Sequence, residues 1–322
     1  MPVFYSLAEI PAQFGATVAS IGNFDGVHLG HRAVLEQVKA GALARGVRSL
    51  AVTFDPHPAR VLRPEGGPRL ICGLEERIRL IAETGIDAVL VLPFTEELSQ
   101  LRAAEFAKQI LVDRLRVAEV HEGANFRFGY RAEGGVAELA ALGAELGYAV
   151  RVHGALEVHG IQVSSSGIRG LVADGDVRRA RWLLGRPFTL LGHAERGRGI
   201  GTRLTVPTIN LTESAELLLP GKGVYVTRMQ IEQECFDAVT NVGDRPTFAD
   251  ASFAVETHLL DFPAVDSAHG PVELTPETQL RLTFLARIRN EVRWPSAEAL
   301  KAQIGRDVLF ARRYLRRLPS GG

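Results

Sequence analysis

The pattern of apolar and polar positions changes its period about halfway along the chain. Up to about residue 163, short β-rich apolar runs alternate with stretches whose apolar residues recur at helical spacing. The runs are 17–22, 49–54, 88–92, 117–121 and 148–152, and the clearest helical stretches are 74–83, 103–115 and 136–146. This alternation predicts an α/β domain, a doubly wound parallel sheet with helices on both faces, whose ligands bind beyond the carboxyl ends of the strands.

The second half has the pattern of a different domain. After two short helical stretches in 168–184, short strands punctuated by glycine and proline dominate from Phe188 to Leu285, which predicts a small antiparallel β-barrel. A final helix is expected over 296–318, with an apolar stripe that packs across the barrel. The stripe consists of Leu300, Ile304, Val308, Leu309 and Tyr314. We place the domain boundary so that the domains are 1–185 and 186–322.

Composition limits the kinds of partner. Lys+Arg and Asp+Glu both number 37 in 322 residues, so no overall charge favours nucleic acid or an anionic membrane, and small molecules are the expected partners. Cys72 and Cys235 are far apart, which indicates neither a disulfide framework nor a zinc site. The amino terminus lacks the features of a signal peptide. We therefore expect a cytoplasmic protein.

The segment 22–31, G-N-F-D-G-V-H-L-G-H, carries the most informative chemistry. It follows an apolar strand, and His31 is expected to open the helix behind it. The amide groups of a helix start attract anions, and Gly26 and Gly30 let a phosphate approach the backbone. Two imidazoles there can donate hydrogen bonds to a phosphate as charge develops on it. This arrangement is typical of a nucleotide-phosphate site.

Other interpretations of the histidine pair stay open from these residues alone. Either histidine can be a satisfied structural residue beside a helix. An i, i+3 pair can also ligate a metal, although no cysteine or third histidine stands at ligand spacing nearby.

Three further segments of the first half suggest the rest of one site. The segments 53–58 (T-F-D-P-H-P) and 123–129 (G-A-N-F-R-F-G) supply aromatic rings and prolines for a flat ring and an amide for its polar edge. The segment 164–169 (S-S-S-G-I-R) supplies hydroxyls and Arg169 for phosphate. Each segment also has an ordinary interpretation, respectively a strand stop, core aromatics and a helix cap.

The second half offers a glycine-rich loop followed by oxygen ligands. Gly197, Gly199 and Gly201 precede V-P-T-I-N at 206–210. Glycines let the backbone fold around phosphate, while the Thr208 hydroxyl and the Asn210 carbonyl suit Mg²⁺, which prefers oxygen. A turn between two strands would need similar residues.

In this order, the motifs resemble those of the bacterial bifunctional riboflavin kinase/FAD synthetase family over roughly residues 15–318. The first half is similar to the FMN adenylyltransferase module of the nucleotidyltransferase superfamily, through 22–31, 53–58 and 164–169. The second half is similar to the flavokinase barrel, through 207–210, 223–225, 241–243, 245–248 and 255–258. Three positions depart from the family pattern: Ile209 stands where the family has alanine, Ser166 replaces threonine, and 263–279 lacks the family's Leu-Tyr-Gly turn.

The resemblance implies two ATP-dependent reactions with Mg²⁺. The barrel would convert riboflavin to FMN and ADP, with Glu256 as general base and Thr208 and Asn210 holding Mg²⁺. The first domain would then convert FMN to FAD and diphosphate, with His28 and His31 stabilising charge on the transferred phosphate. The nucleotide-binding residues implied are Gly22, Phe24, Asp25, Gly30, Ser164, Ser165, Ser166, Arg169, Gly197, Gly199 and Gly201. The flavin-binding residues implied are Phe54, Pro56, His57, Pro58, Asn125 and Phe128.

Two alternative functions fit parts of the sequence. An H-x-G-H nucleotidyltransferase acting on another phosphate substrate would explain the first half and leave the barrel motifs without a role. A flavin-binding regulator could keep the fold without turnover.

Overall fold

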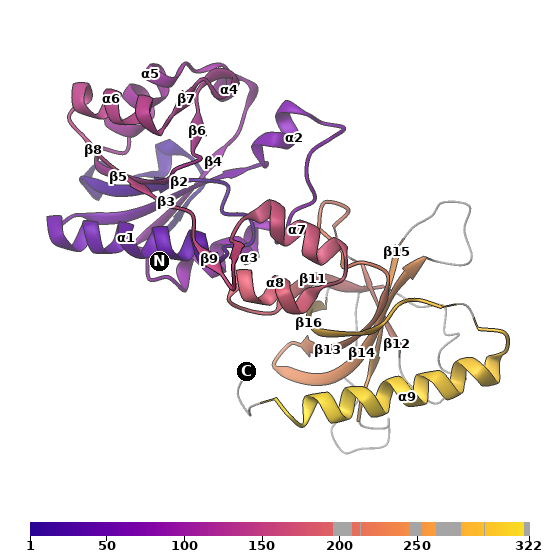
Figure 1. Ribbon diagram of the computed structural model, residues 1–322. Helices are drawn as coiled ribbons and strands as arrows, with labels where there is room; N and C mark the ends of the chain where they lie inside the picture. Colours follow the sequence, from indigo (N-terminus) through magenta and orange to yellow (C-terminus); the bar gives the residue numbers. More distant parts are fainter. Residues whose placement is uncertain (196–207, 213, 245–252, 262–277, 293, 319–322) are drawn as a thin grey trace. The chain divides into compact units, whose positions relative to one another are not determined.

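The computed structural model describes residues 1–195, 208–212, 214–244, 253–261, 278–292 and 294–318, except for the side chains of residues 195, 208, 244 and 253. The chain forms two compact units, Met1–Ser165 and Ser166–Gly322 (Figure 1). No helix among the described residues is both long and apolar enough to cross a membrane.

The first unit contains a six-stranded parallel sheet in the order β1-β4-β3-β2-β5-β8. Five strands confirm the predicted apolar runs, namely β2 (Thr17–Ile21), β3 (Arg48–Asp55), β4 (Ala88–Pro93), β5 (Val117–Gly123) and β8 (Ala149–His153). The additional strand β1 (Val3–Phe4) lies at the edge, beside β4. Because β3 and β5 flank β2, the strand order reverses at β2, and the crevice beyond its carboxyl end is where such sheets bind ligands.

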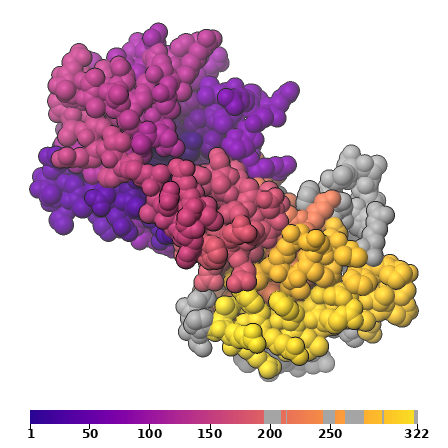
Figure 2. Space-filling model, viewed as in Figure 1, coloured from indigo at the N-terminus to yellow at the C-terminus, as the bar shows by residue number. Residues whose placement is uncertain are grey.

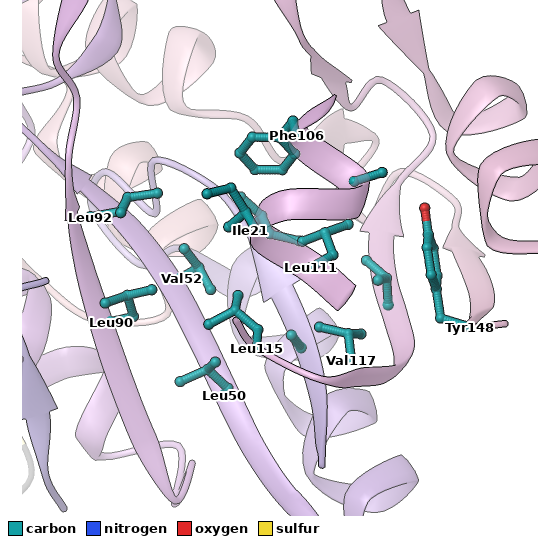
Figure 3. Packing of buried hydrophobic residues seen from close by; sticks show 14 of the residues in the cluster. Ile21, Leu50, Val52, Leu90, Leu92, Phe106, Leu111, Leu115, Val117 and Tyr148 are labelled. Atoms are coloured by element: carbon teal, nitrogen blue, oxygen red, sulfur yellow. The ribbon is translucent and has the colours of Figure 1, made fainter. Parts of the chain in front are cut away.

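Helices cover both faces of this sheet, as the alternating pattern predicts. On one face, α1 (Leu29–Arg45) and α3 (Leu74–Ala82) pack their apolar residues against β2, β3 and β4. On the other, α5 (Ala103–Phe106), a π-helical turn (Ala107–Val112) and α6 (Val136–Leu146) enclose a second core. Figure 3 shows this second core, in which Phe106 and Leu111 point toward Ile21 and Val52 of the sheet.

Short elements complete the first unit. They are the helices α2 (Pro58–Leu62) and α4 (Glu96–Gln100), and the strand pairs β6 (Arg127–Phe128) with β7 (Gly134–Gly135) and β9 (Glu157–Val158) with β10 (Ile161–Gln162).

The second unit is built on a closed antiparallel barrel in the order β11-β12-β15-β14-β13-β16, which confirms the predicted barrel. Its strands are β11 (Phe188–Glu195), β12 (Thr208–Thr212), β13 (Gly223–Ile231), β14 (Glu234–Asp244), β15 (Phe253–Leu259) and β16 (Gln279–Arg289). The interior is mainly apolar, with Phe188, Tyr225 and Phe284 among the largest buried side chains.

Three threonine hydroxyls cross the barrel interior on neighbouring strands. The Thr227 hydroxyl lies 2.8 Å from that of Thr240, which lies 3.0 Å from that of Thr257. All three residues are fully buried. Hydrogen bonding among the three hydroxyls offsets the cost of burying them.

Two helices before the barrel pack with the second unit. In α8 (Val177–Leu184), Val177, Leu183 and Leu184 are buried, and the helix contacts β11 and β16. The preceding helix α7 (Ser165–Ala173) is connected through Val172, whose carbonyl accepts from the Gly221 amide at 2.9 Å. The compact units therefore divide near residue 165, while the domain boundary at 185/186 stays a prediction.

The C-terminal helix α9 (Ala297–Leu315) packs on the outside of the barrel through a face different from the predicted stripe. Ala311 and Leu315 are buried against the barrel, whereas Leu300, Ile304 and Leu309 are 42%, 44% and 57% exposed. Figure 2 shows the yellow surface of α9 open to solvent. The stripe prediction was wrong for these three leucine and isoleucine positions.

A polar residue lies on the packed face instead. Asp307 is 3% exposed and accepts from the Arg289 guanidinium at 3.0 and 2.9 Å. Hydrophobicity alone does not reveal this face, because an ion pair with a distant strand allows the carboxylate to be buried.

Candidate functional site

The loop between β2 and α1 has an unusual backbone conformation, held by side-chain bonds. Phe24 and Val27 adopt positive φ angles of 47° and 37°, which are strained for a bulky or β-branched residue. The buried Asp25 carboxylate fixes the loop by accepting from the Ile71 amide at 2.9 Å and the Cys72 amide at 3.2 Å. The predicted nucleotide-binding residue Asp25 therefore shapes the loop from inside.

The two histidines lie in the first turn of α1, which begins at Leu29, two residues earlier than the sequence predicts. His28 is the N-cap, and its Nδ1 accepts from the backbone N–H of His31 at 3.2 Å. The two rings stack with centroids 3.6 Å apart and planes 15° apart. Since Nδ1 of His28 acts as an acceptor, a neutral His28 carries its proton on Nε2 and can donate from there.

The environment favours a neutral His31. Burial, the neighbouring His28 and the charge of Arg77 together hold the pKa of His31 well below its usual value. The Phe24 ring packs edge-on against His31, with centroids 5.2 Å apart. The start of this 17-residue helix can bind a phosphate through its backbone N–H groups and through an uncharged His31 imidazole as donor.

Nearby glycine and serine residues allow close approach to this helix start. A Cβ on Gly30 would lie 3.2 Å from Nδ1 of His28, so glycine leaves room for the ring. The Ser165 hydroxyl donates to the Asp25 carbonyl at 3.2 Å, which brings the segment 164–165 to the loop. Ser166 and Arg169 belong to the second unit, and their role in binding nucleotide stays a prediction.

A cavity of about 790 Å³ opens in the first unit, and Gly22 and Asn23 of the loop line it. Several aromatic rings line its walls, and its size suits a planar organic ligand. The aromatic lining residues are Phe54, Phe94, Phe106, Phe126, Phe128 and Tyr130. Phe54 and Phe94 meet edge to face, and Phe126 stacks on Phe128, so these rings support one another in pairs.

The cavity includes only some of the predicted flavin-binding residues. Phe54, Pro58 and Phe128 line it. Pro56, His57 and Asn125 are not among the lining residues: the buried His57 caps α2 by accepting from the Ala59 amide at 3.1 Å, and Asn125 is exposed. Sequence reasoning missed Phe94 and Phe106, because neither belongs to a motif that the sequence analysis singled out.

A buried carboxyl group also escaped the sequence analysis. Glu122 of β5 is 4% exposed and accepts from the Ile21 amide at 2.6 Å, and burial raises its pKa well above the usual value. Pairing of β2 with β5 ends at Ala19 and Val120. The side chain of Glu122 thus replaces a strand-to-strand bond at the place where the crevice opens.

On the barrel, the predicted kinase residues share one face of neighbouring strands. Asn210 of β12 pairs directly with Glu256 of β15, which pairs on its other side with Asn241 of β14. Directly paired residues of antiparallel strands lie on the same face. Their neighbour Ile209, one of the departures from the family pattern, is 6% exposed and alternates with them along β12.

Asn210 shows one feature expected of a cation ligand. Its Oδ1 is buried and has no hydrogen-bond partner among the described residues. Glu256, in contrast, is exposed. Thr208 pairs with His258, but its side chain and the loop residues Gly197, Gly199 and Gly201 lie outside the described part of the chain.

Comparison with known proteins agrees with both halves of this description. The family model for FAD synthetase matches residues 10–167, and the model for riboflavin kinase matches residues 184–315. A bifunctional riboflavin kinase/FMN adenylyltransferase of Pseudomonas fluorescens is 36% identical over 97% of each chain. That of Escherichia coli K12 is 33% identical over 96% of each chain.

One solved structure shares the fold of the whole chain. It is described as a macrolide-efflux protein from Streptococcus pneumoniae and superposes with a TM-score of 0.84 at 24% identity, covering 96% of this chain and 98% of that one. At this identity the likeness concerns the fold alone. The two family models and the near full-length relatives, in contrast, confirm the sequence-based assignment, and the chain belongs to the family of bifunctional riboflavin kinases/FMN adenylyltransferases.

Proposed function

We propose that the two reactions of this family take place in this chain at two separate sites, one in the first unit and one on the barrel. The riboflavin kinase part transfers phosphate from ATP to riboflavin, giving FMN and ADP, and the FAD synthetase part transfers AMP from ATP to FMN, giving FAD and diphosphate. The match of the riboflavin kinase model to the barrel removes the alternative in which the barrel motifs have no role.

For FAD formation, the proposed site is the β2–α1 loop together with the aromatic cavity. The flavin ring of FMN would occupy the cavity beside Phe54 and Phe128. An oxygen of the FMN phosphate attacks the α-phosphorus of ATP, and pyrophosphate leaves with the electron pair of the broken bond. His28 and His31 donate hydrogen bonds to the oxygens on which charge develops. The reaction needs no covalent intermediate on the enzyme.

For FMN formation, the proposed site is the barrel face that carries Asn210 and Glu256. Glu256 would accept the proton of the terminal ribityl hydroxyl as this oxygen attacks the γ-phosphorus of ATP. The Asn210 Oδ1 is buried and has no hydrogen-bond partner within the described part of the chain, which suits a hard cation, so Asn210 and Thr208 would hold Mg²⁺. Bound Mg²⁺ would neutralise charge on the phosphates of ATP.

The observation that carries the FAD-forming assignment is the bond from the His31 amide to Nδ1 of His28. It orients the His28 ring at the start of α1 and leaves Nε2 of His28 as the donor, and the His31 ring stacks on the His28 ring. The test is His31→Ala in the full chain, with turnover of riboflavin to FMN and of FMN to FAD measured in one preparation. The exposed Gln37 of the same helix provides the control variant Gln37→Ala.

Loss of one such donor lowers a rate by about 10²–10³-fold. We expect that loss in FAD formation for His31→Ala, with riboflavin phosphorylation and the control variant unchanged. An equal loss of both reactions in a folded His31→Ala protein would contradict the assignment of separate sites.

A further inference from the structure

Arg77 occupies a position of α3 at which the apolar pattern predicts a core residue. It lies on α3 with Leu74, Ile78 and Ile81 at helical spacing, and its side chain is completely buried. Burying a guanidinium group is costly unless a carboxylate or an anion balances it. In the part of the chain that the structure describes, no carboxylate lies within ion-pair distance of Arg77.

The hydrogen bonds of Arg77 reach the end of β3 beside the proposed FAD-forming site. Its Nη1 donates to the Thr53 hydroxyl at 3.2 Å and to the Phe54 carbonyl at 2.9 Å. The Thr53 hydroxyl in turn donates to the Asn23 carbonyl at 3.1 Å. Since Asn23 and Phe54 both line the aromatic cavity, Arg77 connects the loop after β2 to the cavity wall.

Part of the Arg77 guanidinium is left without partners. Its Nε and Nη2 atoms are buried and, among the described residues, have no hydrogen-bond acceptor. The two acceptors of Nη1 are neutral, so they do not balance the charge. Arg77 is also close enough to His31 for its charge to lower the pKa of that imidazole.

We propose that Arg77 is a positioning residue for FAD formation, whose unbalanced positive charge favours the phosphates of ATP at the start of α1 while its bonds hold the loop against the cavity. The inference rests on the proposed assignment of FAD formation to this loop. Arg77 is fully buried and therefore acts through the field of its charge and through Thr53 and Phe54, without touching the nucleotide.

The test separates the charge of Arg77 from its hydrogen bonds. Arg77→Lys keeps the charge, whereas Arg77→Gln keeps donor groups and removes the charge. Arg79 lies on the same helix, is 43% exposed and pairs with Glu76 at 2.7 Å, so Arg79→Gln is the matched control. Each full-length variant is assayed for FMN-to-FAD turnover against ATP concentration and for binding of inorganic pyrophosphate by calorimetry. Riboflavin-to-FMN turnover in the same preparation shows that the barrel is intact.

At an effective dielectric constant of about 20, a unit charge several ångströms from a phosphate changes its affinity by roughly 10- to 100-fold. We expect Arg77→Gln to weaken pyrophosphate binding and raise the KM for ATP by that factor. Arg77→Lys and Arg79→Gln should stay within about threefold of the original protein. Arg77→Gln should also raise the pKa of His31 in an NMR titration, with the His31 signal identified by its absence in His31→Ala.

Unchanged pyrophosphate affinity and unchanged His31 titration in Arg77→Gln would overturn the inference, as would equal losses in Arg77→Lys and Arg77→Gln. Should Arg77→Gln not fold, Thr53→Val tests the hydrogen-bond part of the inference, because it removes one bond of Arg77 and retains the charge. The inference then requires a lower kcat with pyrophosphate affinity within about threefold. FAD formation that persists in His31→Ala would instead contradict the assignment of the reaction to this loop.

Discussion

Two truncated forms of the barrel unit should differ sharply in stability. One fragment begins at Ser166 and keeps α7 and α8, and the other begins at Arg186, at the boundary that the sequence predicts. The second fragment loses the three large, fully buried aliphatic side chains of α8, Val177, Leu183 and Leu184. Burial of each contributes about 1.5–3 kcal/mol, so together they contribute about 5–9 kcal/mol as an upper bound.

The second fragment also loses hydrogen bonds between the removed segment and the barrel. Among them are the bond from the Gly221 amide to the Val172 carbonyl, at 2.9 Å, and the bond from Arg287 to the Asp174 carbonyl, at 3.0 Å. Each contributes about 0.5–1.5 kcal/mol. Because an entire domain is stable by only about 5–15 kcal/mol, we expect the fragment from Arg186 to be largely unfolded at 37 °C.

Circular dichroism during heating measures the stability of each fragment, and riboflavin-to-FMN turnover measures its activity. The fragment from Ser166 should unfold cooperatively and phosphorylate riboflavin, and the fragment from Arg186 should do neither. If the two fragments shared the same melting temperature and turnover, the energies assigned to α8 would be refuted, and the boundary at 185/186 would describe an independent domain.

Three further substitutions test single residues. Glu256→Gln should lower the rate of riboflavin phosphorylation by about 10²–10⁴-fold without affecting FMN-to-FAD turnover. Chromatography of the flavins follows both reactions, and near-normal phosphorylation would exclude the general-base role of Glu256. Glu122→Gln should stabilise the fold at pH 8. Burial raises the folded-state pKa of Glu122 above the unfolded value of about 4.3, so the stability of the original protein falls as the pH rises through the folded-state pKa, and the uncharged glutamine avoids this loss. In urea unfolding, the difference in stability between Glu122→Gln and the original protein should shrink toward zero below pH 4. A difference that does not depend on pH would point to another cause. Gly26 has a φ of +77°, and a Cβ there would lie 2.8 Å from Ile71, so Gly26→Ala should lower the folding stability by about 1–3 kcal/mol and impair FAD formation. Gly46 has a φ of +65° with open space around it, so Gly46→Ala should leave the cavity and the β2–α1 loop intact.

The elements that the sequence predicted well are those with a clear period. The strands from β2 to β8 follow short apolar runs, and the position of the histidine pair at a helix start follows from the residues on either side. Local sequence carries this information because a strand or an amphipathic helix must present one regular face to the core.

Apart from the cavity residues Phe94 and Phe106, the residues that sequence analysis missed are polar groups buried among apolar ones. Arg77 and Glu122 take positions that an apolar residue would normally fill. Arg77 of α3 bonds to Thr53 of β3, and Glu122 of β5 bonds to Ile21 of β2. The same reason explains Asp307, whose partner Arg289 lies in β16. Such contacts depend on the assembled fold, so the period of a single segment does not reveal them.

The threonine hydroxyls inside the barrel bear on the fidelity of folding. A slip of one residue between two strands exchanges their faces, and the apolar pattern opposes it. A slip of two residues between β14 and β15 keeps the faces and would set Thr240 against Val255 or Leu259, and Thr257 against Ala238 or Val242, all of them apolar and buried. The Thr257 hydroxyl would then lose its bond to Thr240, and a buried hydroxyl without a partner costs about 1–3 kcal/mol. The bond between Thr240 and Thr257 therefore disfavours a misaligned barrel that hydrophobic packing alone would accept.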